Sequence, residues 1–140
     1  MPRILHLGLG NFARAHLAWY TDRANGAAYG ADWRITAVAM RTTGLRDAMA
    51  ADGHAYALLI RGASGTQVAR IAVIDRCLAL AEDPAAVVAA IAAPEVEIVT
   101  LTVTEKGYRF GPDGGVDLSD PDIAADLAGD RGPRTAIGVL

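Results

Sequence analysis

The sequence predicts an α/β fold with a doubly wound, mainly parallel sheet. Three observations support this prediction. Segments 4–7, 33–40 and 98–103 are almost continuously apolar, which is typical of parallel strands covered on both faces. Helical patterns separate these segments, and a glycine-containing turn follows the first of them. The 140 residues are enough for one domain, residues 1–140, with one hydrophobic core.

Three helices are expected between the strands. The first covers residues 14–23. The second covers 43–51, where Leu45, Ala48 and Met49 share a face before Asp52-Gly53. The third begins at Asp83-Pro84, a capping acid followed by proline at the first helical position, and ends before Pro94.

Two β-hairpins are expected to interrupt the simple alternation of strands and helices. Residues 55–60 and 67–74 alternate around a glycine-containing turn and predict the first hairpin. Residues 108–110 and 116–118 predict a smaller second one. A last helix should begin at Asp120-Pro121 and stop at Gly129.

The turn after the first strand matches the pattern G-x-G-x-x-A at Gly8, Gly10 and Ala13. In a Rossmann-like fold, the first small residue permits the turn, the second lets the backbone approach a pyrophosphate, and the third packs helix against strand. The amide groups of Asn11 and Phe12, at the start of the helix, would then face the phosphates. With 15 Gly and 29 Ala in the chain, an ordinary glycine turn is the alternative.

Two further segments should meet the glycine turn at the carboxyl edge of the sheet, where ligands of such folds bind. Thr102 and Thr104 follow the strand near position 100, and Arg41 follows the second strand. An arginine at that place suits the 2′-phosphate of NADP, whereas an acid suits NAD. A solvated or adenine-stacking Arg41 is an equal alternative.

Glu105 and Lys106 form an adjacent acid and base on the loop where a nicotinamide would lie, so they are candidates for proton transfer. Lys106 is the only lysine of the chain. An exposed charged turn is the favoured interpretation of this pair, because structural ion pairs also perturb pKa values.

Composition excludes several other classes. His6, His16, His54 and Cys77 lack metal-site spacing, so no metal is expected; His6 alternates out of a strand and Cys77 reads as a core residue. A net charge of −3 with dispersed arginines argues against nucleic acid. No apolar run reaches the roughly 18 residues of a membrane span, and no leader precedes the first strand, so a cytoplasmic location is expected.

Four motif blocks together resemble the polyol-specific long-chain dehydrogenase family of mannitol dehydrogenase and fructuronate reductase. They recur in the family's order across nearly the whole chain. G-x-G-x-F-x-R-A-H and T-E-K-G-Y are far more specific than the glycines alone. The blocks are HLGLGNFARAHLAWYTDRA at 6–24, ADGHAYALL at 51–59, TLTVTEKGY at 100–108 and DLSDPDIAADLAG at 117–129.

The resemblance implies an N-terminal Rossmann-like domain followed by a mostly helical C-terminal domain, which is absent here. Such enzymes use NAD, or alternatively NADP, to interconvert a sugar alcohol or aldonate and its keto form, without a metal. The family's catalytic lysine and its asparagine and histidine partners lie in the helical domain, so no catalytic residue is expected in this chain. Ala13 stands where many members carry a bulkier residue, which is compatible with close packing.

We therefore interpret the chain as a truncated cofactor-binding domain, which would bind a polyol or sugar-acid substrate only together with the missing domain. WYTDRA at 19–24 leans slightly toward fructuronate reductase. The alternative is a dinucleotide-binding or interaction fragment without activity of its own. An apolar end at Ile137, Val139 and Leu140 would then offer a surface for self-association.

Overall fold

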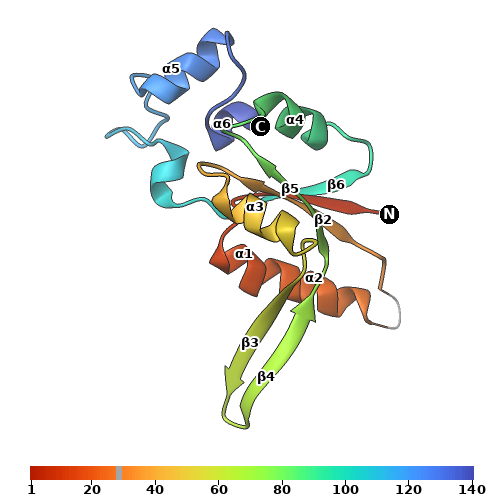
Figure 1. Cartoon of the computed structure of the whole chain (residues 1–140). Coiled ribbons are helices and arrows are strands. Elements are labelled where there is room, and N and C mark those ends of the chain that lie inside the picture. The colour runs from red at the N-terminus through yellow and green to blue at the C-terminus, as the bar shows by residue number, and fades with distance from the viewer. Residues whose placement is uncertain (28–29) are drawn as a thin grey trace.

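A computed structural model describes residues 1–27 and 30–140 and shows a central four-stranded parallel sheet (Figure 1). The strand order is β5-β2-β1-β6, so the chain builds outward on one side of β1 and then crosses back to its other side. The predicted α/β fold with a mainly parallel sheet is confirmed. The strands are β1 (Arg3–Leu7), β2 (Arg34–Ala39), β5 (Ile74–Ala79) and β6 (Val96–Leu101).

Helices cover both faces of this sheet, as a doubly wound fold requires. On one face, α1 (Asn11–Ala15), α2 (Leu17–Asn25) and α3 (Gly44–Ala51) follow β1 and β2 in turn. There, Ala18 of α2 and Met49 of α3 pack on Ile4 and Ile35. Within the described residues, no helix is both long and apolar enough to cross a membrane.

The opposite face is covered by α4 (Pro84–Ile91) and α6 (Ala136–Val139). Leu5 and Leu7 of β1 are fully buried beneath them. Asp83 caps α4 as predicted, because its carboxylate accepts the Ala86 N–H at 2.8 Å. Because successive side chains of β1 point to opposite faces of the sheet, β1 contributes to the apolar clusters on both faces.

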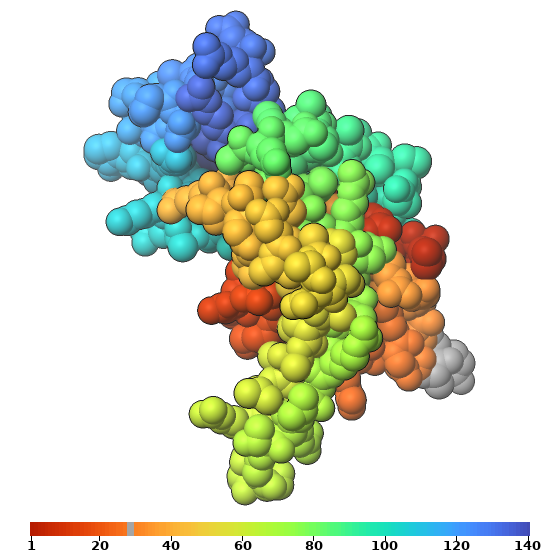
Figure 2. All heavy atoms as spheres, viewed as in Figure 1, coloured from red at the N-terminus to blue at the C-terminus, as the bar shows by residue number. Residues whose placement is uncertain are grey.

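The first hairpin consists of β3 (Tyr56–Gly62) and β4 (Gly65–Ile71), which project from the body of the molecule (Figures 1 and 2). The prediction that its second strand continues to residue 74 is wrong. β4 ends at Ile71, and residues from Ile74 onward form β5, which the sequence analysis missed. Asp75 and Arg76 broke the apolar pattern, and both are exposed because β5 lies at the edge of the sheet.

Two other elements differ from expectation. The first helix begins at Asn11 and is divided at His16, whose backbone angles of φ −118° and ψ −71° leave the helical range. The expected second hairpin is reduced to a single bridge between Phe110 and Val116. Arg109 takes a left-handed conformation with φ 52°, which ends the extended backbone before a ladder can form.

Three short helices follow β6 in the C-terminal part of the chain. A one-turn 3-10 helix, η1 (Glu105–Tyr108), follows β6, and α5 (Pro121–Ala128) ends at Gly129 in a left-handed cap. The expectation of an uncovered apolar end is wrong at Val139, which is buried against the sheet by α6. Ile137 and Leu140 remain exposed.

Candidate functional site

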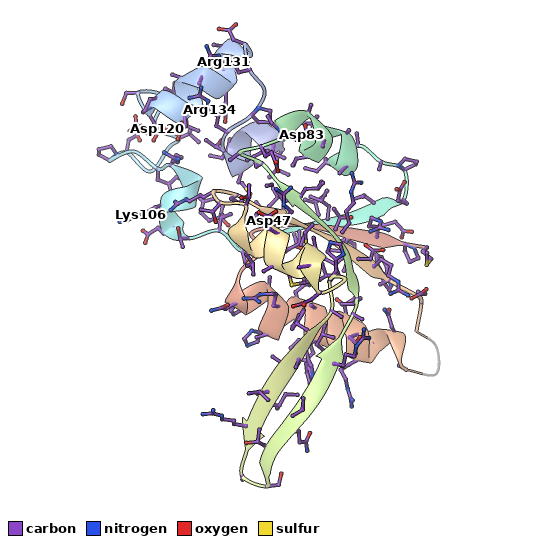
Figure 3. All side chains as sticks on the ribbon, viewed as in Figure 1. Asp47, Asp83, Lys106, Asp120, Arg131 and Arg134 are labelled. Carbon is purple, nitrogen blue, oxygen red and sulfur yellow. The ribbon has the colours of Figure 1, made fainter. Side chains whose placement is uncertain are left out.

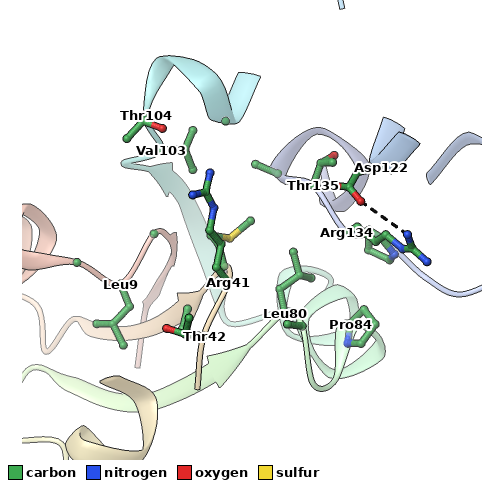
Figure 4. A pocket seen from close by; sticks show the side chains of 18 of the residues that line it. Leu9, Arg41, Thr42, Leu80, Pro84, Val103, Thr104, Asp122, Arg134 and Thr135 are labelled. Carbon is green, nitrogen blue, oxygen red and sulfur yellow. Dashed lines mark ion pairs between the residues drawn. The ribbon is translucent and has the colours of Figure 1, made fainter. Parts of the chain in front are cut away.

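A cavity of about 800 Å³ opens at the carboxyl edge of the sheet, where the strand order reverses between β1 and β6 (Figure 4). The ends of all four parallel strands contribute to it, and the loop between α5 and α6 forms the opposite wall. The three segments expected to converge do so. The residues of these three segments that line the cavity are Gly8, Leu9 and Gly10 after β1, Arg41 and Thr42 after β2, and Thr102, Val103 and Thr104 after β6.

Gly8 is held in a conformation that other residues rarely adopt, with φ +115°. A Cβ atom at this position would lie 2.6 Å from the carbonyl oxygen of Thr102. The amides of Gly8 and Leu9 both donate to the Val38 carbonyl, at 3.0 and 2.9 Å. The turn is therefore clamped between β2 and β6, and only glycine fits its first position.

Gly10 faces open space instead. A Cβ atom there would meet only the Gly8 carbonyl oxygen, at 3.6 Å. The first bond of α1 runs from the Arg14 amide to the Gly10 carbonyl at 3.1 Å, so the amides of Asn11 and Phe12 have no intrahelical acceptor. Both residues follow Gly10, which lines the cavity, and free donors at the start of a helix suit an anionic group.

The side chains that follow Gly10 lie outside the cavity wall. Ala13, the third small residue in the pattern, is buried in α1. Asn11 accepts a hydrogen bond from Arg14 at 2.5 Å, and Phe12 is exposed and stacks on His16. The side chains of Asn11 and Phe12 therefore contact Arg14 and His16, whereas their backbone amides have no intrahelical acceptor.

His6 contacts a residue that holds the glycine turn, and sequence reasoning missed this contact. It is 1% exposed in β1, and its ring nitrogens lie 2.8 Å from the hydroxyls of Thr100 and Thr102. Thr102 in turn donates to the Gly8 carbonyl at 3.1 Å. Burial lowers the pKa of His6 below its ordinary value, and the nearby Gly8 backbone opposes this only in part, so the neutral ring is favoured. One feature of the sequence could have indicated this contact: the threonines Thr100 and Thr102 stand at alternate positions at the end of the strand that pairs with β1.

Arg41 is exposed at the end of β2, and its side chain extends toward Val103 and Thr104 in Figure 4. The other wall of the cavity carries Arg134, which pairs with Asp122 at 3.7 Å. Arg109 also pairs with Asp122, at 2.8 Å. Among the described residues no ion pair involves Arg41, so its charge is available to a ligand.

Glu105 and Lys106 do not line the large cavity. They are exposed on η1 and border a separate hollow of about 460 Å³, together with Arg109, Asp117 and Asp120. Figure 3 shows Lys106 on η1, on the same side of the molecule as Asp120 and away from Asp83 at the start of α4. The geometry agrees with the exposed charged turn that the sequence analysis favoured.

A parallel sheet with a glycine turn at the reversal of strand order defines the Rossmann class of α/β domains. Residues 2–135 match the model of the mannitol dehydrogenase Rossmann domain, and the chain belongs to this family. The Rossmann domain of this family is a dinucleotide-binding domain of polyol dehydrogenases.

Relatives of known sequence and structure agree with this assignment. The chain is 40% identical to the uncharacterized oxidoreductase YeiQ of Escherichia coli (strain K12), with 99% of the chain and 29% of that protein covered. It is 36% identical to mannitol 2-dehydrogenase of Cereibacter sphaeroides, with 99% and 30% covered. The chain thus spans less than a third of the length of these curated relatives.

Two solved structures superpose on the fold with a TM-score of 0.89 each. One is a mannitol 2-dehydrogenase of Pseudomonas fluorescens in a ternary complex with NAD and D-mannitol, 34% identical, with 99% of this chain and 29% of that one covered. The other is a D-sorbitol dehydrogenase in substrate-free form, 31% identical, with the same coverage.

Proposed function

We propose that this chain is the cofactor-binding domain of an NAD-dependent oxidoreductase acting on a sugar alcohol or aldonate and its keto form. The observation that carries the proposal is the glycine turn, whose Gly8, Leu9 and Gly10 line a cavity of about 800 Å³ at the strand-order reversal. The cavity is large enough for a small organic ligand. The related mannitol 2-dehydrogenase was solved with NAD, which supports the choice of cofactor.

Each part of the site would take a different part of the dinucleotide. The open Gly10 lets the pyrophosphate approach, and the amides of Asn11 and Phe12 would donate to it. Thr102 and Thr104, at the end of β6, would border the nicotinamide half. When bound, the nicotinamide supplies the chemistry of hydride transfer.

Arg41 would lie beside the adenosine ribose at the end of β2. Its free positive charge would tolerate the 2′-phosphate of NADP, which is the alternative cofactor. We place NAD first because of the related complex. Replacing Arg41 with alanine should then weaken NADPH binding more than NADH binding.

The substrate and the catalytic residues are proposed to lie with the remainder of a longer protein, as in relatives more than three times the length of the matched segment. Neither Glu105 nor Lys106 is assigned a catalytic role, because both lie outside the large cavity. The chain alone should therefore bind dinucleotide and show no turnover of mannitol or mannonate. Turnover by the purified chain would contradict the proposal that the catalytic residues lie in the remainder of a longer protein.

Calorimetric titration with NADH and then NADPH tests the proposal. Gly10→Val should abolish binding without unfolding the chain, because its side chain would fill the pyrophosphate approach while its Cβ has room. Gly62→Val is the matched control, since Gly62 lies in the hairpin with no atom within 4 Å of its ideal Cβ. A folded wild-type chain that binds neither nucleotide, or equal binding by Gly10→Val, would overturn the proposal.

A further inference from the structure

Three polar groups form a continuous path from the core of the sheet to the glycine turn. His6 lies in β1 between Thr100 of β6 and Thr102, which directly follows β6, and each ring nitrogen is 2.8 Å from one of the two hydroxyl oxygens. Thr102 reaches onward to the Gly8 carbonyl at 3.1 Å. His6 is buried and does not line the cavity, whereas Thr102 and Gly8 do.

The protons on this path can be assigned from the geometry. The single hydroxyl proton of Thr102 is donated to the Gly8 carbonyl, so the same oxygen must accept from Nε2 of His6. Nε2 therefore carries the proton of the neutral ring. Nδ1 is left as an acceptor, and the Thr100 hydroxyl donates to it.

We propose that His6 is a positioning residue for dinucleotide binding, which acts by holding the Thr102 hydroxyl on the Gly8 carbonyl. A hydroxyl is free to rotate, and the Nε2 proton fixes its direction. The Gly8 peptide is thereby held against β6 at the place where the turn begins. This inference rests on the proposed function, because the turn matters only if a pyrophosphate binds there.

The two threonines separate this role from simple core stability. Both contact the same ring at the same distance, and only Thr102 contacts the turn. Loss of either hydroxyl removes one hydrogen bond from His6. A purely structural role predicts that neither loss changes the NADH affinity of the folded chain, whereas the positioning role predicts that only the loss at Thr102 weakens NADH binding.

Variants at the three positions test the proposal by NADH titration, each checked for folding by circular dichroism. Thr102→Val and His6→Asn should weaken NADH binding about fivefold, because each breaks one link of the path. Thr102→Ser, Thr100→Val and His6→Gln should stay within about twofold. The Gln amide can still reach Thr102, whereas the shorter Asn amide reaches only the Nδ1 position. His6→Asn should add no further loss to Thr102→Val.

Two measurements on the free chain keep the inference separate from the proposed function. Nitrogen-15 NMR of the imidazole should show a neutral ring protonated at Nε2. Amide hydrogen exchange at Gly8 and Leu9 should accelerate in Thr102→Val and His6→Asn and stay unchanged in Thr100→Val. Wild-type chain that does not bind NADH while showing this pattern would refute the function and keep the positioning of the turn. A proton on Nδ1, or equal effects of the two Thr→Val changes, would refute the inference.

Discussion

At the scale of single residues, Gly8 and His6 determine how the glycine turn approaches the chain after β6. Gly8 provides a positive φ and a close approach to β6, and His6 supports the same approach from within the core. The glycine was predictable because its pattern lies between a strand and a helix. The partnership of His6 with Thr102 was not, because they are 96 positions apart in the sequence.

Gly8→Ala should lower the free energy of unfolding by about 2–4 kcal/mol, because it combines an unfavourable φ with a 2.6 Å overlap against backbone. Gly53→Ala provides the comparison, since Gly53 also has a positive φ but open space around its Cβ. Its cost should stay near 1 kcal/mol. Urea unfolding measures both, and equal costs would show that the contact with Thr102 does not matter.

At the scale of elements, the β3–β4 hairpin shows how a marginal unit is held in place. A two-stranded ribbon is barely stable alone in water, and the outer part of this one is exposed. Its base is anchored by Ile71, fully buried in the core, and by Tyr56, whose hydroxyl donates to the Arg14 carbonyl at 2.6 Å. The anchor joins the hairpin to the helix that begins at the glycine turn.

Tyr56→Phe should lower the free energy of unfolding by about 1 kcal/mol and speed amide exchange in β3 and β4. Burial raises the pKa of Tyr56 to about 12, and the nearby Arg14 charge offsets this only in part. The neutral hydroxyl is the form that stabilises the fold, so its contribution is complete below pH 10. The difference between variant and wild type should shrink as pH rises from about 10 to about 12, and a constant difference would exclude this hydrogen bond as its source.

At the scale of the whole molecule, the part of the chain that the structure describes leaves β5 and β6 as the two edge strands of the sheet, and β6 exposes apolar side chains. β6 is paired with β1 on one side only, and its Ile98 and Val99 are 42% and 37% exposed. An open strand edge with exposed apolar side chains favours association through both backbone and side chains. The C-terminal segment, where the sequence analysis expected self-association, exposes Leu140 at 67% but buries Val139. Self-association through that segment stays a prediction.

Sedimentation velocity at rising concentration should separate these two surfaces. We expect Ile98→Lys to reduce association more than Leu140→Lys, because the strand edge adds backbone hydrogen bonds to its apolar contact. Val68→Lys, on the exposed face of the hairpin, controls for added charge. A larger effect of Leu140→Lys would assign the contact to the C-terminal segment, and a monomer at every concentration would refute both surfaces.

The sequence by itself determined the parallel sheet, the glycine turn, the caps at Asp83 and Asp120, and the family. Each of these depends on residues close together in the chain, where apolar periodicity, turn chemistry and capping act directly. Even the convergence of three segments at one cavity followed from a general rule of parallel sheets.

Only the tertiary structure decided the features that depend on partners distant in sequence. β5 is a strand although Asp75 and Arg76 interrupt its apolar pattern, because an edge strand needs pairing with β2 on one side only. Val139 is buried because α6 folds back onto the sheet. His6 joins the glycine turn because β6 returns beside β1 and brings Thr102 to it. Local patterns do not encode such contacts, since crossing connections bring these residues together in space.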